Sequence, residues 1–235
     1  MTELESLSAF LARTSEFVSD SLPHGFGFET NANLPLKVDI DGKMKPFMGN
    51  TVVFPLPEDI RRQIGRIQER LYQLCGPALA QPLEVSSLHI TLHDLLSGKP
   101  TPDLRNRVAC MRDPVLARLN RIPEWGEAVR LCSTALFNMV NTSMVLGFAP
   151  ADEASCERLM AYYEMFQEVV YLNYPLTPHV TVAYFRPGTV TTDLVEKLRE
   201  TVDEVGRREK LVVELPANTL EYQLFSDMNH YWAER

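Results

Sequence analysis

The sequence lacks long apolar runs and has few cysteines, and each absence excludes a class of protein. Its longest apolar runs are far shorter than the roughly 18–20 residues of a membrane-spanning helix, so we expect no membrane partner. The first segment has no basic region ahead of an apolar one, which argues against a secretory signal. The four cysteines are widely separated and form neither a C-x-x-C pair nor a zinc-ligand pattern. We therefore predict a cytoplasmic protein with reduced thiols.

Basic residues are also scarce relative to acidic ones. The chain has 23 Lys and Arg against 31 Asp and Glu, a formal net charge of −8. Such a chain is poorly suited to neutralising the phosphates of a long nucleic-acid duplex. Apolar residues make up 45% and charged residues 23% of the 235 positions, which excludes collagen-like, coiled-coil and disordered chains. We expect a monomer whose partner is a small nucleotide or an RNA end.

A strand–helix–strand pattern occurs twice, about 90 residues apart. In each copy a short β-rich run is followed by an amphipathic helix and then by a second β-rich run. The segments are 51–56, a helix from Pro57 and 87–95 in the first copy, and 142–148, 152–170 and 178–185 in the second. The dipeptide Asn50-Thr51 recurs as Asn141-Thr142. Such repetition is typical of an internal duplication.

We predict a single two-lobed domain over residues 1–235, with repeats at about 47–95 and 141–186 and an N-terminal helix at 3–20. Asp113-Pro114 indicates the start of a further short helix. The remaining predicted elements are a strand at 128–137, a helix at 193–205 and strands at 211–215 and 220–225. Because helices and strands mix without a long parallel βαβ series, the predicted fold class is α+β, with mostly antiparallel sheets around a central cleft.

Two of the five histidines begin the same tripeptide pattern at the same place in the two repeats. The motifs are His89-Ile90-Thr91 and His179-Val180-Thr181. Side chains two residues apart on a strand point to the same face, so each motif presents an imidazole beside a hydroxyl. Two such motifs facing each other suit attack on a phosphodiester. A neutral imidazole accepts a proton, a protonated one donates a proton, and the hydroxyls hold the phosphoryl oxygens.

These motifs and the duplicated frame resemble the two-histidine (2H) phosphoesterase superfamily, which includes the 2′-5′ RNA ligase-like and cyclic phosphodiesterase proteins. The stretch 41–51, Asp-Gly-Lys-Met-Lys-Pro-Phe-Met-Gly-Asn-Thr, is similar to one bacterial and fungal branch. The resemblance covers about residues 47–186. It implies a two-lobed α+β fold, catalysis by His89 and His179 without a metal or other cofactor, and substrate binding by Thr91 and Thr181. Pro178 departs from the hydrophobic residue that often precedes the second histidine.

His93 extends the first motif by two residues. Strict alternation would place it on the face of His89 and Thr91, where it could line the cleft and bind substrate. His89 and His93 could instead be two ligands of a metal site, but no Asp or Glu within the strand completes a triad. A third interpretation is a histidine at the rim of the sheet with no role in the site.

Other candidate substrate-binding residues lie near the strands that are predicted to form the cleft. Lys43, Lys45 and Arg186 are the nearest basic residues in the sequence, and each could attract or hold a phosphate. Alternation places Phe185 on the face of the second motif, where it could stack on a nucleobase, and places Tyr184 on the opposite face. Solvated loop charges and core aromatics are the plainer interpretations of these residues.

The favoured function is a metal-independent phosphodiesterase that acts on a cyclic phosphate or a 2′-5′ phosphodiester of a nucleotide or RNA end. A module that binds a phosphate-bearing nucleotide without turnover is the first alternative, although binding alone does not require two titratable groups. A metal-dependent hydrolase is the second alternative, and it would need carboxylate ligands that the motifs do not provide.

Overall fold

The computed structural model describes residues 4–19, 21–122, 127–208 and 210–234. Within them the strands form two four-stranded sheets and one two-stranded ribbon, and every pairing is antiparallel. The first sheet has the order β10–β9–β2–β3, formed by Tyr231–Ala233, Glu221–Phe225, Met48–Pro55 and His89–Gly98. The second has the order β6–β5–β4–β8, formed by His179–Tyr184, Ser143–Pro150, Val129–Met139 and Val212–Leu215. The ribbon pairs β1 (Phe28–Glu29) with β7 (Thr189–Val190). The predicted α+β class with antiparallel sheets is confirmed.

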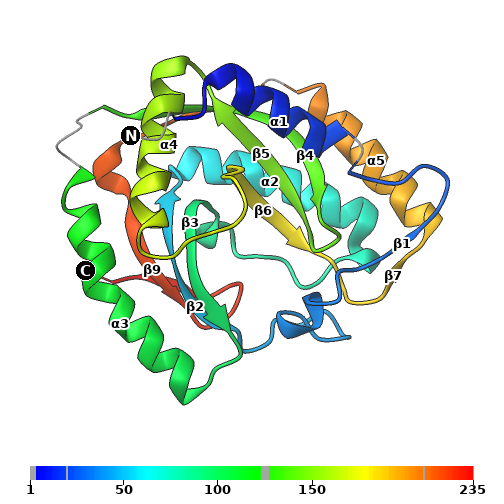
Figure 1. The fold of residues 1–235 in the computed structure, drawn as a ribbon. Coiled ribbons are helices and arrows are strands. Elements are labelled where there is room, and N and C mark those ends of the chain that lie inside the picture. The colour runs from blue at the N-terminus through cyan, green and yellow to red at the C-terminus, as the bar shows by residue number, and fades with distance from the viewer. Residues whose placement is uncertain (1–3, 20, 123–126, 209, 235) are drawn as a thin grey trace.

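The two sheets meet along the strands that carry the motifs. Strand β3 is the last strand of the first sheet and β6 is the last strand of the second, and the two strands contact each other near the centre of the molecule (Figure 1). Both strands begin at the histidine of their motif. The fold therefore places the two motifs on neighbouring edge strands.

The helices of the two strand–helix–strand units hold the sheets together. Helix α2 (Glu58–Cys75) follows β2 in the chain but packs against β6 of the other sheet and against helix α5 (Thr192–Gly206). Its Gln68 side chain donates a hydrogen bond to the carbonyl of Val182 in β6. Helix α4 (Glu153–Gln167) follows β5 and contacts β4 and β5, but also β3 of the first sheet. Each unit thus contributes a helix that touches the motif strand of the other unit.

Helix α1 differs slightly from the predicted 3–20 helix. It spans Leu7–Ser19 and packs against α4, β4 and β5, so it lies on the lobe that carries β6. Residues 4–6 are not helical, and the predicted end residues Glu3 and Asp20 lie outside the described residues. Short 3-10 turns complete the structure: η1 (Leu34–Leu36), η2 (Gly76–Ala78), η3 (Val85–Ser87) and η5 (Ala217–Thr219).

The prediction of a short helix starting at Asp113-Pro114 is wrong. Helix α3 runs over Pro102–Leu119, and the Thr101 hydroxyl caps it by accepting a hydrogen bond from the Leu104 amide. Pro102 occupies the first turn, where a missing N–H leaves no hydrogen bond unmade. Pro114 lies inside the helix. It removes one backbone hydrogen bond, and the turns on either side continue across it.

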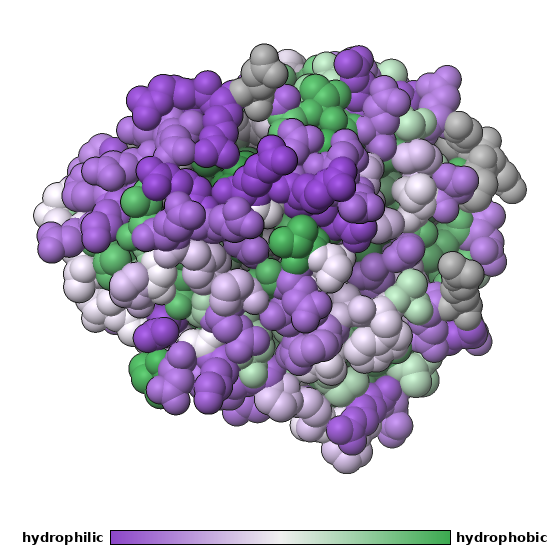
Figure 2. Space-filling view, turned by 180° about the vertical axis from the view of Figure 1, so that it is seen from behind, coloured by the Kyte–Doolittle hydropathy of each residue, from purple (hydrophilic) through white to green (hydrophobic). Residues whose placement is uncertain are grey.

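The face turned away from the viewer of Figure 1 is largely hydrophilic (Figure 2). Hydrophobic residues on this face lie in small groups among polar ones, which is the normal pattern of a water-exposed surface. None of the described helices combines the length and the apolar composition that crossing a membrane would require.

Gly49 in β2 offers a test of how closely the first sheet is packed. A β-carbon at this position would meet the backbone carbonyl of Leu96, the Phe225 ring at 2.5 Å and the Ser97 β-carbon at 2.8 Å. Because backbone cannot move aside as a flexible side chain can, Gly49→Ala should lower the free energy of unfolding by about 1–3 kcal/mol. Urea denaturation followed by circular dichroism measures this change.

Gly206, the last residue of α5, provides the matched control. A β-carbon there would meet no atom within 4 Å. Gly206→Ala should therefore leave the unfolding free energy within about 0.5 kcal/mol of the wild-type value, or raise it by up to about 1 kcal/mol because alanine favours a helix. Equal unfolding midpoints for the two variants would contradict the packing described at Gly49.

Candidate active site

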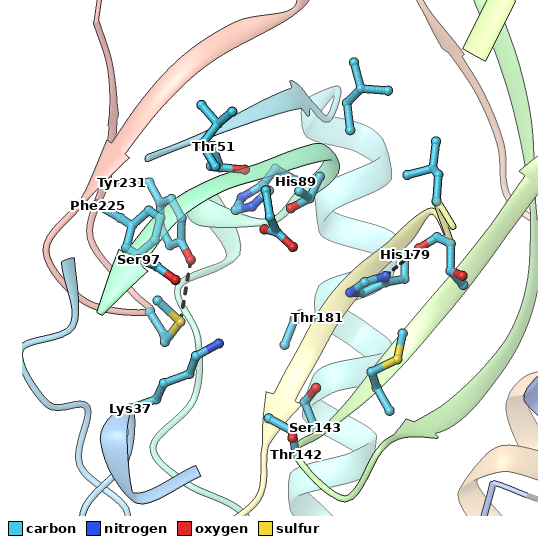
Figure 3. Close-up of a pocket in the computed structure, with 18 of the residues that line it drawn as sticks. Lys37, Thr51, His89, Ser97, Thr142, Ser143, His179, Thr181, Phe225 and Tyr231 are labelled. Carbon is cyan, nitrogen blue, oxygen red and sulfur yellow. Dashed lines mark hydrogen bonds between the residues drawn. The ribbon is translucent and has the colours of Figure 1, made fainter. Parts of the chain in front are cut away.

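The two motif histidines are held by equivalent hydrogen bonds. His89 Nδ1 lies 2.7 Å from the carbonyl oxygen of Ser87, and His179 Nδ1 lies 2.7 Å from that of Thr177. A carbonyl oxygen can only accept, so in the neutral rings Nδ1 carries the proton and Nε2 keeps its lone pair. The two rings stand on opposite sides of one space, on β3 and β6 (Figure 3). Each Nε2 is therefore the nitrogen available for proton transfer.

One cavity of about 740 Å³ is lined by both histidines and by both motif threonines, Thr91 and Thr181. All four residues are half-buried. No described residue forms a hydrogen bond with either threonine hydroxyl. The cavity thus brings together two imidazoles and two hydroxyls that can donate to a bound anion, as the motif spacing predicts.

Burial lowers the pKa of both histidines below the usual 6.5, because the charged imidazolium loses its hydration. The hydrogen bonds to Ser87 and Thr177 partly oppose this shift and raise each pKa. The negative charge of Asp94 also raises both pKa values, whereas the charge of His179 lowers the pKa of His89 and the ammonium of Lys37 lowers that of His179. Both imidazoles are therefore mainly neutral at pH 7 in the empty cavity, and a bound anion would favour protonation of one of them.

Both motif strands contain a β-bulge one residue after the threonine. In β3 the bulge leaves Leu92 without a partner on β2, and in β6 it leaves Val182 without a partner on β5. The flanking pairs are Val53–Thr91 and Val52–His93 in the first sheet, and Val145–Thr181 and Met144–Ala183 in the second. An extra residue reverses the alternation of side chains beyond it. Residues after each bulge therefore face opposite to what strict alternation predicts.

The bulge at Leu92 corrects the prediction for His93. This side chain is 1% exposed, packs beside the rings of Tyr163 and Phe166, and does not line the cavity. Its Nδ1 lies 2.6 Å from the Asp94 carbonyl and its Nε2 lies 3.4 Å from Gln167 Oε1, so both nitrogens face protein groups. Asp94 lines the cavity in its place.

Across the described residues no three His, Cys, Asp or Glu side chains group closely enough to hold a metal ion.

The bulge at Val182 corrects the prediction for Phe185 in the same way. Phe185 is fully buried and packs edge-on against Phe28, with ring centroids 5.3 Å apart. Tyr184, which strict alternation assigns to the opposite face, lines the cavity. Phe185 is therefore a core aromatic residue, which is the plainer of the two interpretations given for it.

The basic residues nearest in sequence to the motif strands do not line the cavity. The Lys45 ammonium donates to the carbonyl of Pro35, and Arg186 lies beside Gly42. The loop before β2 turns back on itself through the bridge between Val38 and Met44, and this turn carries Lys43. The same turn brings Lys37 to the cavity instead. Its ammonium lies over the rings of Phe47 and Tyr184, at 5.2 and 5.7 Å from their centroids.

Arg13 of α1 also lines the cavity, although no pattern in the sequence predicts it there. Its Nη2 donates to the Leu176 carbonyl at 3.0 Å and its Nη1 to the Thr177 hydroxyl at 3.4 Å. Glu5 accepts two further hydrogen bonds from the same guanidinium, at 2.9 and 2.8 Å. Arg13 therefore contacts the two residues whose backbone leads to the carbonyl that holds the ring of His179. No local signal links it to a motif more than 160 residues away.

Two tyrosines border the cavity beside the first motif. The ring of Tyr231 in β10 meets that of His89 edge-on, with centroids 4.8 Å apart. The Tyr174 hydroxyl donates to Asp94 Oδ2 at 3.0 Å. Burial and the negative charge of Asp94 raise the pKa of Tyr174, so its hydroxyl remains a neutral donor.

The register of the sheets also corrects the alignment of the two repeats. Asp94 pairs with Thr51, and Tyr184, at the same distance beyond its motif, pairs with Ser143. Thr51 therefore corresponds to Ser143, and the recurring Asn-Thr dipeptides are not equivalent. Thr51 and Ser143 both line the cavity.

No protein-family model matches the chain, and no curated protein matches it significantly. Solved structures do. A conserved protein of unknown function from Agrobacterium tumefaciens is similar with a TM-score of 0.67 and 20% identity, covering 88% of this chain and 93% of that one. LigT from E. coli, complexed with 3′-AMP, is similar with a TM-score of 0.50 and 14% identity, covering 81% of this chain and 97% of LigT.

The chain has the LigT fold. The protein TT0787 from Thermus thermophilus is similar as well, with a TM-score of 0.50, 14% identity and coverage of 79% of this chain and 94% of that one. The α+β fold with antiparallel sheets that the resemblance of the H-x-T motifs implies is therefore confirmed. Because these sequence identities are low, the similarity establishes the LigT fold but not the activity. The activity must be inferred from the chemistry of the site.

Histidine NMR tests the electrostatics of the cavity without an activity assay. His89 and His179 should titrate below pH 6.5, and their neutral rings should carry the proton on Nδ1. His230 is an internal control, because its hydrogen bond with Asp227 raises its pKa above 6.5. The measurement is a long-range ¹H–¹⁵N spectrum recorded from pH 4.5 to 8. Titration of both motif histidines at or above pH 6.5 would contradict the burial described here.

Proposed function

We propose that this protein is a metal-independent phosphodiesterase that acts on a cyclic phosphate or a 2′-5′ phosphodiester of a nucleotide or RNA end. One observation carries the assignment: two imidazoles with free Nε2 atoms line one cavity, each beside a threonine hydroxyl that no described residue engages. Binding a phosphate needs hydrogen-bond donors, but it does not need two titratable groups that can exist in opposite protonation states.

In the proposed reaction the phosphate binds between the two motifs, and its non-bridging oxygens accept hydrogen bonds from Thr91 and Thr181. The bound negative charge favours the protonated form of one imidazole, which becomes the general acid. The other, neutral imidazole removes a proton from water through Nε2 as the water oxygen attacks phosphorus. The phosphorus bond to one ribose oxygen breaks, and the general acid protonates that oxygen. A cyclic phosphate thus becomes a phosphate monoester, and neither step needs a Lewis acid.

A protein of similar fold, LigT, supports a nucleotide as the ligand. LigT, whose fold this chain has, is crystallised with 3′-AMP, a nucleoside with a phosphate on its ribose. The cavity of this protein, at about 740 Å³, falls within the range of about 300–1,000 Å³ that is typical of sites for small-molecule ligands. It is therefore large enough for a nucleotide. Tyr184 and Tyr231, which both line the cavity, replace Phe185 as candidates for stacking on a base.

Turnover of a substrate panel tests the proposed activity. The panel contains an RNA with a 2′,3′-cyclic end, a 2′-5′-linked dinucleotide, a small cyclic nucleotide and a cyclic sugar phosphate, each incubated with the purified protein and separated by chromatography. At least one should be hydrolysed at the same rate with and without excess EDTA. Loss of activity in EDTA that one divalent ion restores would favour a metal-dependent hydrolase. Binding without turnover of any compound would favour a binding module.

Substitution separates the proton-transfer groups from the phosphate-binding groups. His89→Ala and His179→Ala should each lower kcat by about 10²–10⁴-fold with little effect on product binding, because each removes one proton-transfer step. Thr91→Val and Thr181→Val should lower kcat by roughly 10–10³-fold and weaken product binding more, because each removes a hydrogen bond to the phosphate. Steady-state kinetics and calorimetric product titration measure the two effects.

The exposed His24 provides the control for these variants. His24→Ala removes an imidazole that contacts Arg199 away from the cavity, so its kcat should equal the wild-type value. Wild-type rates in both motif-histidine variants would show that the reaction occurs elsewhere in the protein.

A further inference from the structure

We propose that Lys37 forms a second anion subsite in the cavity, and that the substrate is a nucleotide or oligonucleotide end with a further phosphate on the 5′ side of the reacting ribose. This inference rests on the proposed function, because it assumes that the reacting phosphate lies at the two motifs. It narrows the substrate class from any cyclic phosphodiester to one with two phosphates on the same nucleoside unit.

Lys37 is held where it faces the cavity. Its backbone N–H donates to the Leu34 carbonyl and its own carbonyl accepts from the Lys45 amide, so the loop is fixed on both sides. The ammonium lies over the faces of Phe47 and Tyr184, and the end of the side chain points into the space between the motif strands (Figure 3). Cation–π contact with two rings limits where the ammonium can move.

The charge of Lys37 is not neutralised by the protein. No carboxylate of the described residues forms an ion pair with it. The other cation that lines the cavity, Arg13, is already paired with Glu5. Asp94, which also lines the cavity, accepts a hydrogen bond from Tyr174. In a chain with a net charge of −8, Lys37 is therefore the cavity group best suited to attract an anion.

The rings that hold Lys37 lie beyond the motifs along their strands. Tyr184 lies five residues beyond His179, which corresponds to about 15 Å of extended strand. Phe47 directly precedes β2, whose opposite end pairs with His89 through Pro55. Both rings that hold the ammonium thus come from the ends of strands that point away from the motif histidines. The ammonium still lies near enough to His179 for its charge to lower the pKa of that imidazole. An anion at Lys37 would therefore lie beside a phosphate at the motifs, as the second phosphate of one nucleoside unit does.

Calorimetric titration with two ligands tests the subsite without requiring turnover. Wild-type protein should bind adenosine 3′,5′-bisphosphate about 10–100-fold more tightly than 3′-AMP. This difference in affinity is what one additional charge-assisted contact, from Lys37 to the 5′-phosphate, is expected to give. Lys37→Met should bind the two ligands equally, and Lys37→Arg, which keeps the charge, should retain most of the preference. The preference should fall as salt concentration rises, because salt screens the added contact.

Lys45→Met is the matched control, because Lys45 belongs to the same loop but does not line the cavity. It should keep the wild-type preference for the bisphosphate. Equal binding of both ligands by wild-type protein would overturn the inference. An equal loss of affinity for both ligands in Lys37→Met would also overturn it, since Lys37 would then contact the phosphate at the motifs.

The proposed activity can fail independently of this subsite. If no compound of the panel is hydrolysed but the preference for the bisphosphate depends on Lys37, the subsite stands and the catalytic proposal falls. If the panel is hydrolysed and the bisphosphate has no advantage, the activity stands and the subsite falls.

Discussion

The site depends on the contact between two edge strands, β3 and β6. An edge strand exposes unpaired backbone groups, and proteins normally cover such edges. Here each edge lies beside the other, and the helix of each strand–helix–strand unit packs on the motif strand of the opposite unit. Gln68, which bonds to the carbonyl at the bulge of β6, is one such contact between units. Separating the lobes would therefore expose backbone, break helix packing and divide the four motif side chains between two surfaces.

The two bulges set the composition of the cavity beyond the motifs. Without them His93 and Phe185 would line the cavity. With them Asp94 and Tyr184 do. The exchange changes the charge of the cavity, because a third imidazole would repel a protonated motif imidazole, whereas the carboxylate of Asp94 raises the pKa of His179. Tyr184 supplies one of the two rings that hold Lys37. A change of one residue in strand register thus decides which groups surround a bound phosphate.

Segments outside the duplicated frame complete the site. Arg13 of α1 donates to the Leu176 carbonyl and the Thr177 hydroxyl beside His179, and Tyr231 of β10 packs against His89. The loop before β2 contributes Lys37. The two units are nearly symmetric in their motif histidines and threonines. Arg13, Tyr231 and Lys37 differ in chemistry, so the surroundings of the two motifs differ. In the proposed reaction, these unlike surroundings of two similar motifs would decide which imidazole is the acid and which is the base.

The amino-acid sequence is enough to predict the α+β class, the two strand–helix–strand units and the pairing of His89-Thr91 with His179-Thr181. These features follow from local periodicity and residue spacing, which can be read without knowing any contact between distant segments. It did not determine the bulges, because Leu92 and Val182 are ordinary strand residues and no local rule marks an extra residue there. Nor did it determine Arg13 or Lys37, whose partners are distant in the chain. Which side chains join the motifs depends on tertiary contacts, because packing between segments far apart in the sequence sets the strand register and brings loops to the cavity.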